Sequence, residues 1–400
     1  MLRQLGACEF TPKEELLRRI DGLKAKMAET GIDFAVILQN VDLFYFAGTI
    51  QKGAMVIPVD QDPILFIEKS LDRARMETEL EITPIKRDKD MKDVLQGRHV
   101  LKGKGGMELD VVPVANYERF KGVVGFDTFV DISGAIRELR MIKSPFELEQ
   151  VKNSARICDR IFSRAREVVR EGVREVDIDA ELVAEGRRLG HQGFLRMRGL
   201  NQEMMSLYVT AGSSGTIPSC GDVPVAGLGV THALAQGSSM KKVERGVPVM
   251  VDYGAGYNGY ITDETRPFVV GELKGIFRKP YEVAREIVED TTAFGREGVN
   301  ATEIYARACE IVKRAGLTDH FMGYGDGQVS FIGHGLGLEI NELPVITARH
   351  DRILQEGMVF AYEPKFIFPG EGVIGIEVDF IVHKDGMERL AVTPIDLVRV

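Results

Sequence analysis

The chain has 400 residues, of which 44% are apolar and 28% charged, a composition typical of a folded globular protein. Its 51 basic and 60 acidic residues give a net charge of −9, which disfavours a nucleic-acid partner. We expect no membrane partner, because the longest apolar runs fall far short of the roughly 20 residues that a spanning helix needs. The first residues lack the apolar core of a signal peptide, and four widely spaced cysteines fit reduced thiols, so we expect a cytoplasmic protein.

The first third of the chain predicts mixed helices and strands. Thr-Pro-Lys-Glu at residues 11–14 has the spacing of a capping box with proline at the first helical position. Apolar runs at 34–38, 55–59 and 64–67 predict strands. The charges of alternating sign at 86–93 indicate a solvated surface. The helix after the capping box carries an apolar stripe of Leu16, Leu17, Ile20, Leu23 and Met27.

A domain boundary is expected near residue 140. Ser-Pro-Phe-Glu at residues 144–147 combines an N-cap serine, proline at the first helical position and a glutamate at the third. A helix is therefore predicted over 145–171. We divide the chain into an N-terminal domain, 1–140, and a second domain, 141–400.

A predicted β-hairpin in the second domain carries two aspartates. The Asn-Gly pair at 258–259 is a strong signal for a type I′ turn between two strands. With this pair as the loop, Gly254 faces Asp263, and Asp252 faces Thr265. The two aspartates then share one face of the hairpin, within ~7–8 Å at the backbone, with the glycine leaving space between them. Two carboxylates so placed repel each other in a partly buried pocket unless a cation lies between them.

Three further polar residues lie in apolar or glycine-rich segments. The strand-like segment 358–368 contains Glu363, and residues 373–382 alternate so that Glu377 points away from their apolar face. His334 follows a glycine in a segment where the backbone can approach other groups closely. Taken singly, such residues are more often solvated than functional. Together with the two aspartates, they indicate one shared site.

These residues carry a resemblance to the pita-bread metallopeptidases, the group of methionine aminopeptidase, aminopeptidase P and prolidase. The segment 251–266 resembles the central signature of the group. His334 in Gly-His-Gly-Leu-Gly, Glu363 in Tyr-Glu-Pro and Glu377 in Gly-Ile-Glu follow in the same order, with spacings most similar to the Xaa-Pro dipeptidase (prolidase) and aminopeptidase P branch.

The resemblance extends to the N-terminal domain and so covers nearly the whole chain. Residues 40–48 and 139–145 resemble the creatinase-type N-terminal domain and its linker. The implied fold is α+β, with a pita-bread catalytic domain preceded by a smaller creatinase-like α/β domain. A homodimer is implied as well.

The implied function is that of a dinuclear metal-dependent hydrolase that cleaves short peptides before proline. Four carboxylates and one imidazole suit two Mn²⁺ ions, with Co²⁺, Zn²⁺ or Fe²⁺ as alternatives. By resemblance, a metal-bridging hydroxide would attack the amide, and Glu363 would pass a proton to the leaving amine. The implied ligands are Asp263 and Glu377 bridging both metals, Asp252 on one metal, and His334 and Glu363 on the other.

Three positions bear on the substrate. Asn341 stands where family peptidases usually carry a second histidine, and an amide can hydrogen-bond a substrate carbonyl but cannot become cationic. Gly375 stands where some prolyl-specific members carry an arginine. His232 is a candidate for the histidine that commonly precedes the first ligand aspartate. We therefore expect His232 and Asn341 to take part in catalysis beside Glu363.

Two alternatives stay open. The first is a hydrolase or lyase of a small C–N or C–S substrate on the same scaffold, which the missing histidine and arginine favour. The second is a catalytically silent module that binds peptides or proteins, against which the five retained ligands count.

Overall fold

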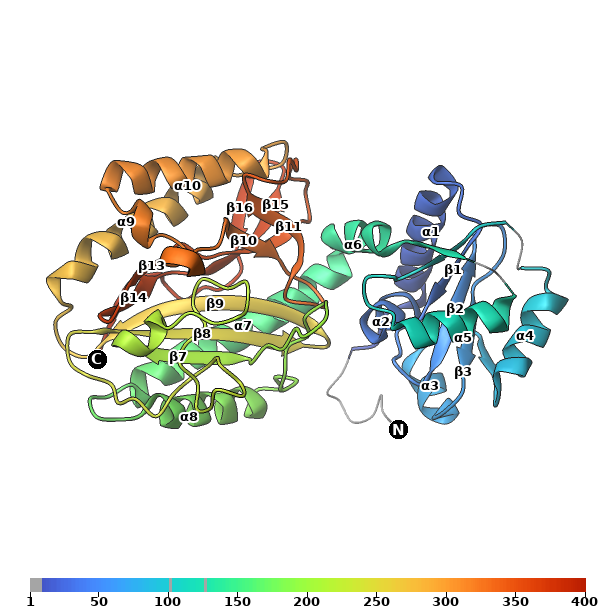
Figure 1. The fold of residues 1–400 in the computed structure, drawn as a ribbon, viewed down its shortest axis with the longest axis horizontal. Helices are drawn as coiled ribbons and strands as arrows, with labels where there is room; N and C mark the ends of the chain where they lie inside the picture. The colour runs from blue at the N-terminus through green and yellow to red at the C-terminus, as the bar shows by residue number, and fades with distance from the viewer. Residues whose placement is uncertain (1–8, 101–102, 126–127) are drawn as a thin grey trace. The chain divides into compact units, whose positions relative to one another are not determined.

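The computed structural model describes residues 9–100, 103–125 and 128–400. The chain forms two compact units, Met1–Arg140 and Met141–Val400 (Figure 1). None of the helices in the described part of the chain combines the length and the apolar character that a membrane span requires.

The N-terminal unit is built on a six-stranded sheet in the order β4-β3-β2-β1-β5-β6. Its strands are β1 (Phe34–Ile37), β2 (Gly53–Pro58), β3 (Ile64–Ile67), β4 (Ile82–Pro84), β5 (Gly105–Met107) and β6 (Phe129–Asp131). Its helices are α1 (Lys13–Glu29), α2 (Asn40–Ala47), α3 (Leu71–Glu77), α4 (Asp88–Gly97), α5 (Val114–Val124) and α6 (Ser133–Met141). Phe34 and Val36 of β1 share a core with α4 and α5, so these helices cover one face of the sheet.

The three strands predicted in this unit are confirmed to within two residues, but the first helix differs from its prediction at two points. The helix begins at Lys13, with Pro12 in the N-cap position, so the predicted capping box is displaced. Thr11 makes no cap bond, and its hydroxyl is buried without a hydrogen-bond partner. Leu17 of the predicted stripe is 37% exposed, whereas the other four members are buried.

The second unit contains two larger sheets, each covered by two helices, and a separate two-stranded ribbon. The first sheet has the strand order β17-β9-β8-β7, and α7 and α8 pack against it (Figure 1). The second sheet has the strand order β11-β10-β12-β15-β16, and α9 and α10 lie on its outer side. The strands are β7 (Leu207–Ala211), β8 (Pro248–Tyr257), β9 (Tyr260–Val269), β10 (Phe331–Gly335), β11 (Glu342–Thr347), β12 (Val359–Tyr362), β13 (Lys365–Phe368), β14 (Gly372–Gly375), β15 (Val378–His383), β16 (Gly386–Arg389) and β17 (Val398–Arg399). The helices are α7 (Pro145–Val168), α8 (Glu175–Arg188), α9 (Gly275–Phe294) and α10 (Ala301–Ala315).

The capping box predicted for α7 is confirmed. The Glu147 N–H donates to the Ser144 hydroxyl oxygen at 3.2 Å, and the Ser144 N–H donates to the Glu147 carboxylate at 3.0 Å. The helix ends at Val168, three residues before the predicted end.

Each of the two segments predicted as single strands near the C-terminus is divided in two. Pro364 has no N–H, so the strand pairing of β12 stops there, and β13 pairs with β14 in a separate two-stranded ribbon. Between β14 and β15, the backbone of Glu377 pairs instead with Thr265 of β9. The apolar alternation survives both breaks, because Ile374, Ile376 and the residues that follow at the same period all lie in one core. Glu363 and Glu377 therefore stand at the two breaks.

Candidate metal centre

The hairpin of β8 and β9 has the predicted register. Asp252 pairs with Thr265, Gly254 pairs with Asp263, and the two turn residues at 258–259 have the positive φ angles of 49° and 88° that a type I′ turn requires. The reason for Gly254 differs from the expected one. A Cβ atom at this position would lie 2.3 Å from a methyl carbon of Leu195, so Leu195 fills the space that the glycine leaves.

The five expected metal ligands converge at this hairpin. Ligand atoms of Asp263, His334 and Glu377 all lie within 4.8 Å of one another. His334 Nε2 lies 3.9 Å from Asp263 Oδ2 and 3.9 Å from Glu363 Oε1. The other ring nitrogen, Nδ1, faces the Gly335 carbonyl oxygen at 3.4 Å and must donate to it, which leaves Nε2 as the ligand atom. One imidazole among three carboxylates fits a single divalent cation on this side of the cluster.

On the Asp252 side, the cluster already contains a cation. The ammonium of Lys365, the first residue of β13, donates to Asp252 Oδ2 at 3.0 Å, Glu363 Oε2 at 3.0 Å and Glu377 Oε2 at 2.8 Å. We did not predict this residue from the sequence. The signal was present, since Lys365 follows Glu363 by two residues in a strand-like segment, a spacing that puts both side chains on the same face.

A second layer of hydrogen bonds holds the ligands in place. The Thr265 hydroxyl donates to Glu377 Oε2 at 2.7 Å, and the Asp263 N–H donates to Asp379 Oδ2 at 2.9 Å. Arg266 donates to the Glu377 carbonyl oxygen at 2.7 Å. Two of these bonds hold the backbone at Asp263 and at Glu377. The positions of these two carboxylates are therefore fixed by backbone contacts as well as by side-chain contacts.

Burial dominates the protonation behaviour of the cluster. It raises the pKa of Asp263 well above its usual range, and the charges of Glu377 and Asp252 raise it further. Burial also raises the pKa of Glu377, although Lys365 opposes this shift. For Lys365 itself, burial lowers the pKa, but the surrounding carboxylates outweigh burial and the net shift is upward. The side chain therefore carries its positive charge at neutral pH.

The sequence predicts catalytic roles for two further residues, which the structure places differently. His232 lies in an exposed turn closed by a bridge between Thr231 and Leu234. Within the described ranges, no hydrogen bond or ion pair links it to the cluster. The Asn341 side chain accepts from the Arg198 N–H at 2.9 Å and donates to the Arg198 carbonyl oxygen at 2.9 Å. Asn341 thus anchors the segment before β7, and both catalytic roles stay predictions.

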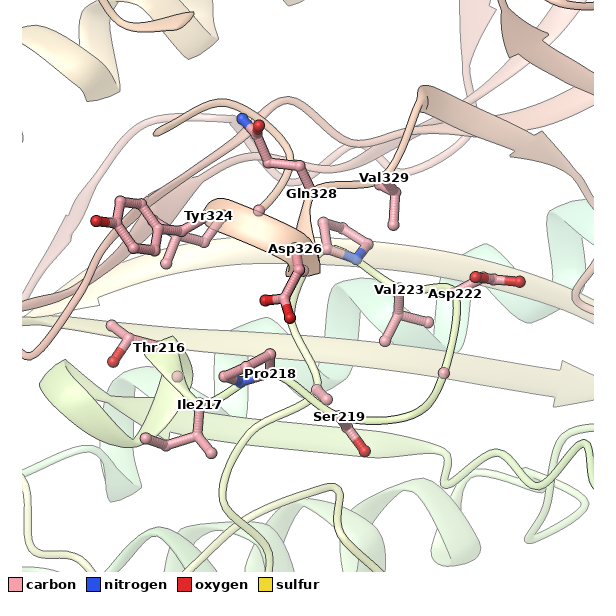
Figure 2. Close-up of a pocket in the computed structure, with 18 of the residues that line it drawn as sticks. Thr216, Ile217, Pro218, Ser219, Asp222, Val223, Tyr324, Asp326, Gln328 and Val329 are labelled. Atoms are coloured by element: carbon pink, nitrogen blue, oxygen red, sulfur yellow. The ribbon is translucent and has the colours of Figure 1, made fainter. Parts of the chain in front are cut away.

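Two cavities lie in this unit, and one of them adjoins the cluster. This small cavity of about 10 Å³ is lined by Asp252, Thr265 and Lys365 together with Tyr208, Thr210, Val225, Met250 and Val373. A larger one of about 480 Å³ is lined by residues 215–224 and 323–329, and Figure 2 shows Asp326 pointing across it toward Pro218. The two are neighbours, because Val225 lines the first and Ala226 the second. None of the five ligands lines the larger cavity.

The fold and the ligand cluster define a class: a two-domain metal-dependent hydrolase in which carboxylates and one imidazole form the metal site. Residues 149–384 match the model of metallopeptidase family M24, and residues 19–142 match that of the creatinase/prolidase N-terminal domain. The chain belongs to metallopeptidase family M24, whose members use divalent metals, and its pita-bread and creatinase-like domains are those implied by the resemblance.

Individual relatives point to one branch of the family. The chain is 30% identical to an Xaa-Pro dipeptidase of Pyrococcus furiosus over 381 residues, which cover 95% of this chain and 99% of the relative. Among solved structures, it is similar to a prolidase from Pyrococcus furiosus, with a TM-score of 0.76, 28% identity and coverage of 93% and 99%. An Xaa-Pro dipeptidase from Bacillus anthracis gives a TM-score of 0.80, with 26% identity and coverage of 96% and 100%.

Proposed function

We propose that this protein is a metal-dependent Xaa-Pro dipeptidase. The observation that carries the proposal is the convergence of Asp263, His334, Glu363 and Glu377 at one point of an M24 chain. The full-length similarity to relatives named Xaa-Pro dipeptidase supports a dipeptide substrate over a longer peptide.

A divalent cation bound at these residues supplies a Lewis acid that polarises the scissile carbonyl and lowers the pKa of a water molecule. His334 presents Nε2 to that cation, because Nδ1 is committed to the Gly335 carbonyl oxygen. Glu363 is the proposed proton carrier to the leaving amine; its Oε1 lies 3.9 Å from His334 Nε2, while its Oε2 is held by Lys365. Mn²⁺ is the proposed metal, on the grounds of the oxygen-rich ligand set.

The direct test is hydrolysis of Ala-Pro and of the tripeptide Ala-Pro-Ala by chelator-treated protein with and without added Mn²⁺. We expect Mn²⁺-dependent cleavage of the dipeptide and little cleavage of the tripeptide. Glu363→Gln is the matched inactive variant, because it keeps the shape of the side chain and removes its capacity to carry the proton. Cleavage of the tripeptide at an equal rate would contradict the dipeptidase assignment and indicate an aminopeptidase.

A second candidate, a hydrolase or lyase of a small C–N or C–S substrate, is favoured by one feature of β14. Gly375 stands where, by resemblance, some prolyl-specific members carry an arginine, and a Cβ there would lie 2.6 Å from the Pro364 carbonyl oxygen and 2.7 Å from Lys365 Cα. Without backbone movement, no side chain fits at this position. Protein that binds Mn²⁺ fully but cleaves no Xaa-Pro peptide would support this candidate.

A further inference from the structure

Lys365 uses its full hydrogen-bonding capacity inside the ligand cluster. An ammonium has three N–H donors, and those of Lys365 reach three different carboxylates at 2.8 to 3.0 Å. The side chain is only 4% exposed. Three carboxylate partners are typical of a cation bound within a site. A solvated lysine at the edge of a site would make fewer hydrogen bonds to carboxylates.

The ammonium occupies the position that Asp252 would offer to a metal. Asp252 is the ligand assigned to only one of the two expected metals, and its Oδ2 is bound by Lys365. The cavity beside these two residues measures about 10 Å³, about the space of a single water molecule. A metal at Asp252 therefore cannot bind next to the ammonium and would have to displace it.

Displacement would take the ammonium away from its three carboxylate partners. The rest of the small cavity wall carries no charge and is formed by Tyr208, Thr210, Val225, Met250, Thr265 and Val373. Moving a buried charge away from its ionic partners into uncharged surroundings has a cost in free energy. Metal binding at Asp252 would have to offset this cost.

The opposite side of the cluster has free ligand atoms. Glu363 and Glu377 both give Oε2 to Lys365, so their Oε1 atoms remain for a metal beside Asp263 and His334. Charge alone does not decide the number of metals, because four carboxylates and Lys365 sum to −3, and one or two divalent cations bring this to −1 or +1. Space decides it, since the ammonium already fills the position at Asp252 Oδ2.

We infer that the Lys365 ammonium takes the place of one of the two divalent cations expected at this site. The chain then binds a single divalent cation, through Asp263, His334, Glu363 and Glu377, and Asp252 serves as the partner of the lysine. This inference rests on the proposed metal-dependent function but concerns the number of metals bound, which can be measured without any assay of activity.

The test is the metal content of full-length protein that has been stripped with a chelator, loaded with excess Mn²⁺ and desalted. We expect one Mn²⁺ per chain in the unaltered protein and two in Lys365→Ala and Lys365→Gly, whose small side chains open the Asp252 position. Lys384→Met, which removes an exposed lysine of the same unit, is the matched control and keeps one. Circular dichroism confirms that each variant is folded.

Two further measurements distinguish one bound Mn²⁺ ion from two. The electron paramagnetic resonance spectrum of Mn²⁺ is that of an isolated ion in the unaltered protein and that of a coupled pair in the lysine variants. Asp252→Asn keeps one Mn²⁺ per chain, because Asp252 is not a ligand of that ion. Two Mn²⁺ or none in the unaltered protein, or one in both lysine variants, overturns the inference. A protein with one Mn²⁺ and no peptidase activity would overturn the proposed function and leave the inference standing.

Discussion

The two units of the chain bury acidic side chains in different ways. In the N-terminal unit, Asp42 is paired with Arg140 at 2.8 Å, and burial, followed by the charge of Asp42, raises the pKa of Glu108 to about 8. One acid is thus neutralised by an arginine, and the other is protonated at neutral pH. In the catalytic unit, the ammonium of Lys365 binds three carboxylates, those of Asp252, Glu363 and Glu377, and the carboxyl of Asp263 lies in the same cluster.

This difference distinguishes buried charges that stabilise the fold from buried charges that serve a function. A buried carboxylate that is fully compensated fixes a fold and needs no further partner. A cluster with more carboxylates than cations is unfavourable without an added cation, so it is retained where a metal binds. The catalytic unit is therefore distinguished by a cluster in which buried carboxylates outnumber cationic side chains. No single residue marks it in the same way.

The largest expected loss of stability comes from breaking the ion pair of Asp42 and Arg140. Arg140→Met removes the guanidinium that is paired with the buried Asp42 carboxylate, and breaking such a pair costs about 3–5 kcal/mol of the free energy of unfolding. Denaturant titration of the full chain measures this loss. Because the pair lies outside the metal site, the loss should be equal with and without Mn²⁺, and a loss that Mn²⁺ reduces would contradict the comparison.

The uncompensated cluster is tested by metal addition. Mn²⁺ at a hundred times its Kd should stabilise the folded chain by about 2.7 kcal/mol and raise the melting temperature. Asp263→Ala should abolish this rise, because the carboxylate is a ligand of the bound ion. Asp385→Ala, at an exposed position in the same unit, is the control and should keep the full rise. An Asp263→Ala protein with an undiminished rise would rule out the ligand set.

A smaller effect concerns the anchor at Asn341. Loss of its two hydrogen bonds to the Arg198 backbone in Asn341→Ala should lower the free energy of unfolding by about 1–2 kcal/mol. Asn341→His separates this role from the predicted catalytic one. From the backbone contacts we expect it to lose stability without gaining turnover, measured as kcat on Ala-Pro. A rise in kcat would instead support a catalytic position for residue 341.

The smallest expected effect is a pH dependence arising from His191. Burial, followed by the charge of Arg187, lowers the pKa of this histidine to about 4, so it is neutral in the folded chain. An unfolded histidine titrates near pH 6.5, and therefore the unfolded chain takes up a proton first as the pH falls. Between pH 7 and 5.5 the free energy of unfolding should decrease by about 1 kcal/mol. His191→Gln should flatten this part of the profile, and an unchanged slope would exclude His191 as its source.

The parts of the site that depend on local rules were predictable from the sequence. The Asn-Gly turn and the period of two fix the register of β8 and β9, and they place Asp252 and Asp263 on one face. The capping box fixes the start of α7 in the same way. Such features depend on neighbours within a few residues, which the sequence displays directly.

The parts that depend on distant contacts were not predictable in this way. The break at Glu377 follows from its pairing with Thr265, more than a hundred residues earlier in the chain. The period of two puts Lys365 on the same strand face as Glu363, but its contact with Asp252, 113 residues away, exists only in the folded unit. The sequence predicts which side chains share a face and does not predict which of them meet across the two sheets.

The central claim is that one divalent cation completes a carboxylate cluster that already contains an ammonium. Anomalous diffraction from crystals of the full chain grown with Mn²⁺ tests it most directly. We expect one anomalous peak, bounded by Asp263, His334, Glu363 and Glu377, with the Lys365 ammonium still bound to Asp252. Two peaks with Lys365 displaced, or no peak at these residues, would contradict the claim.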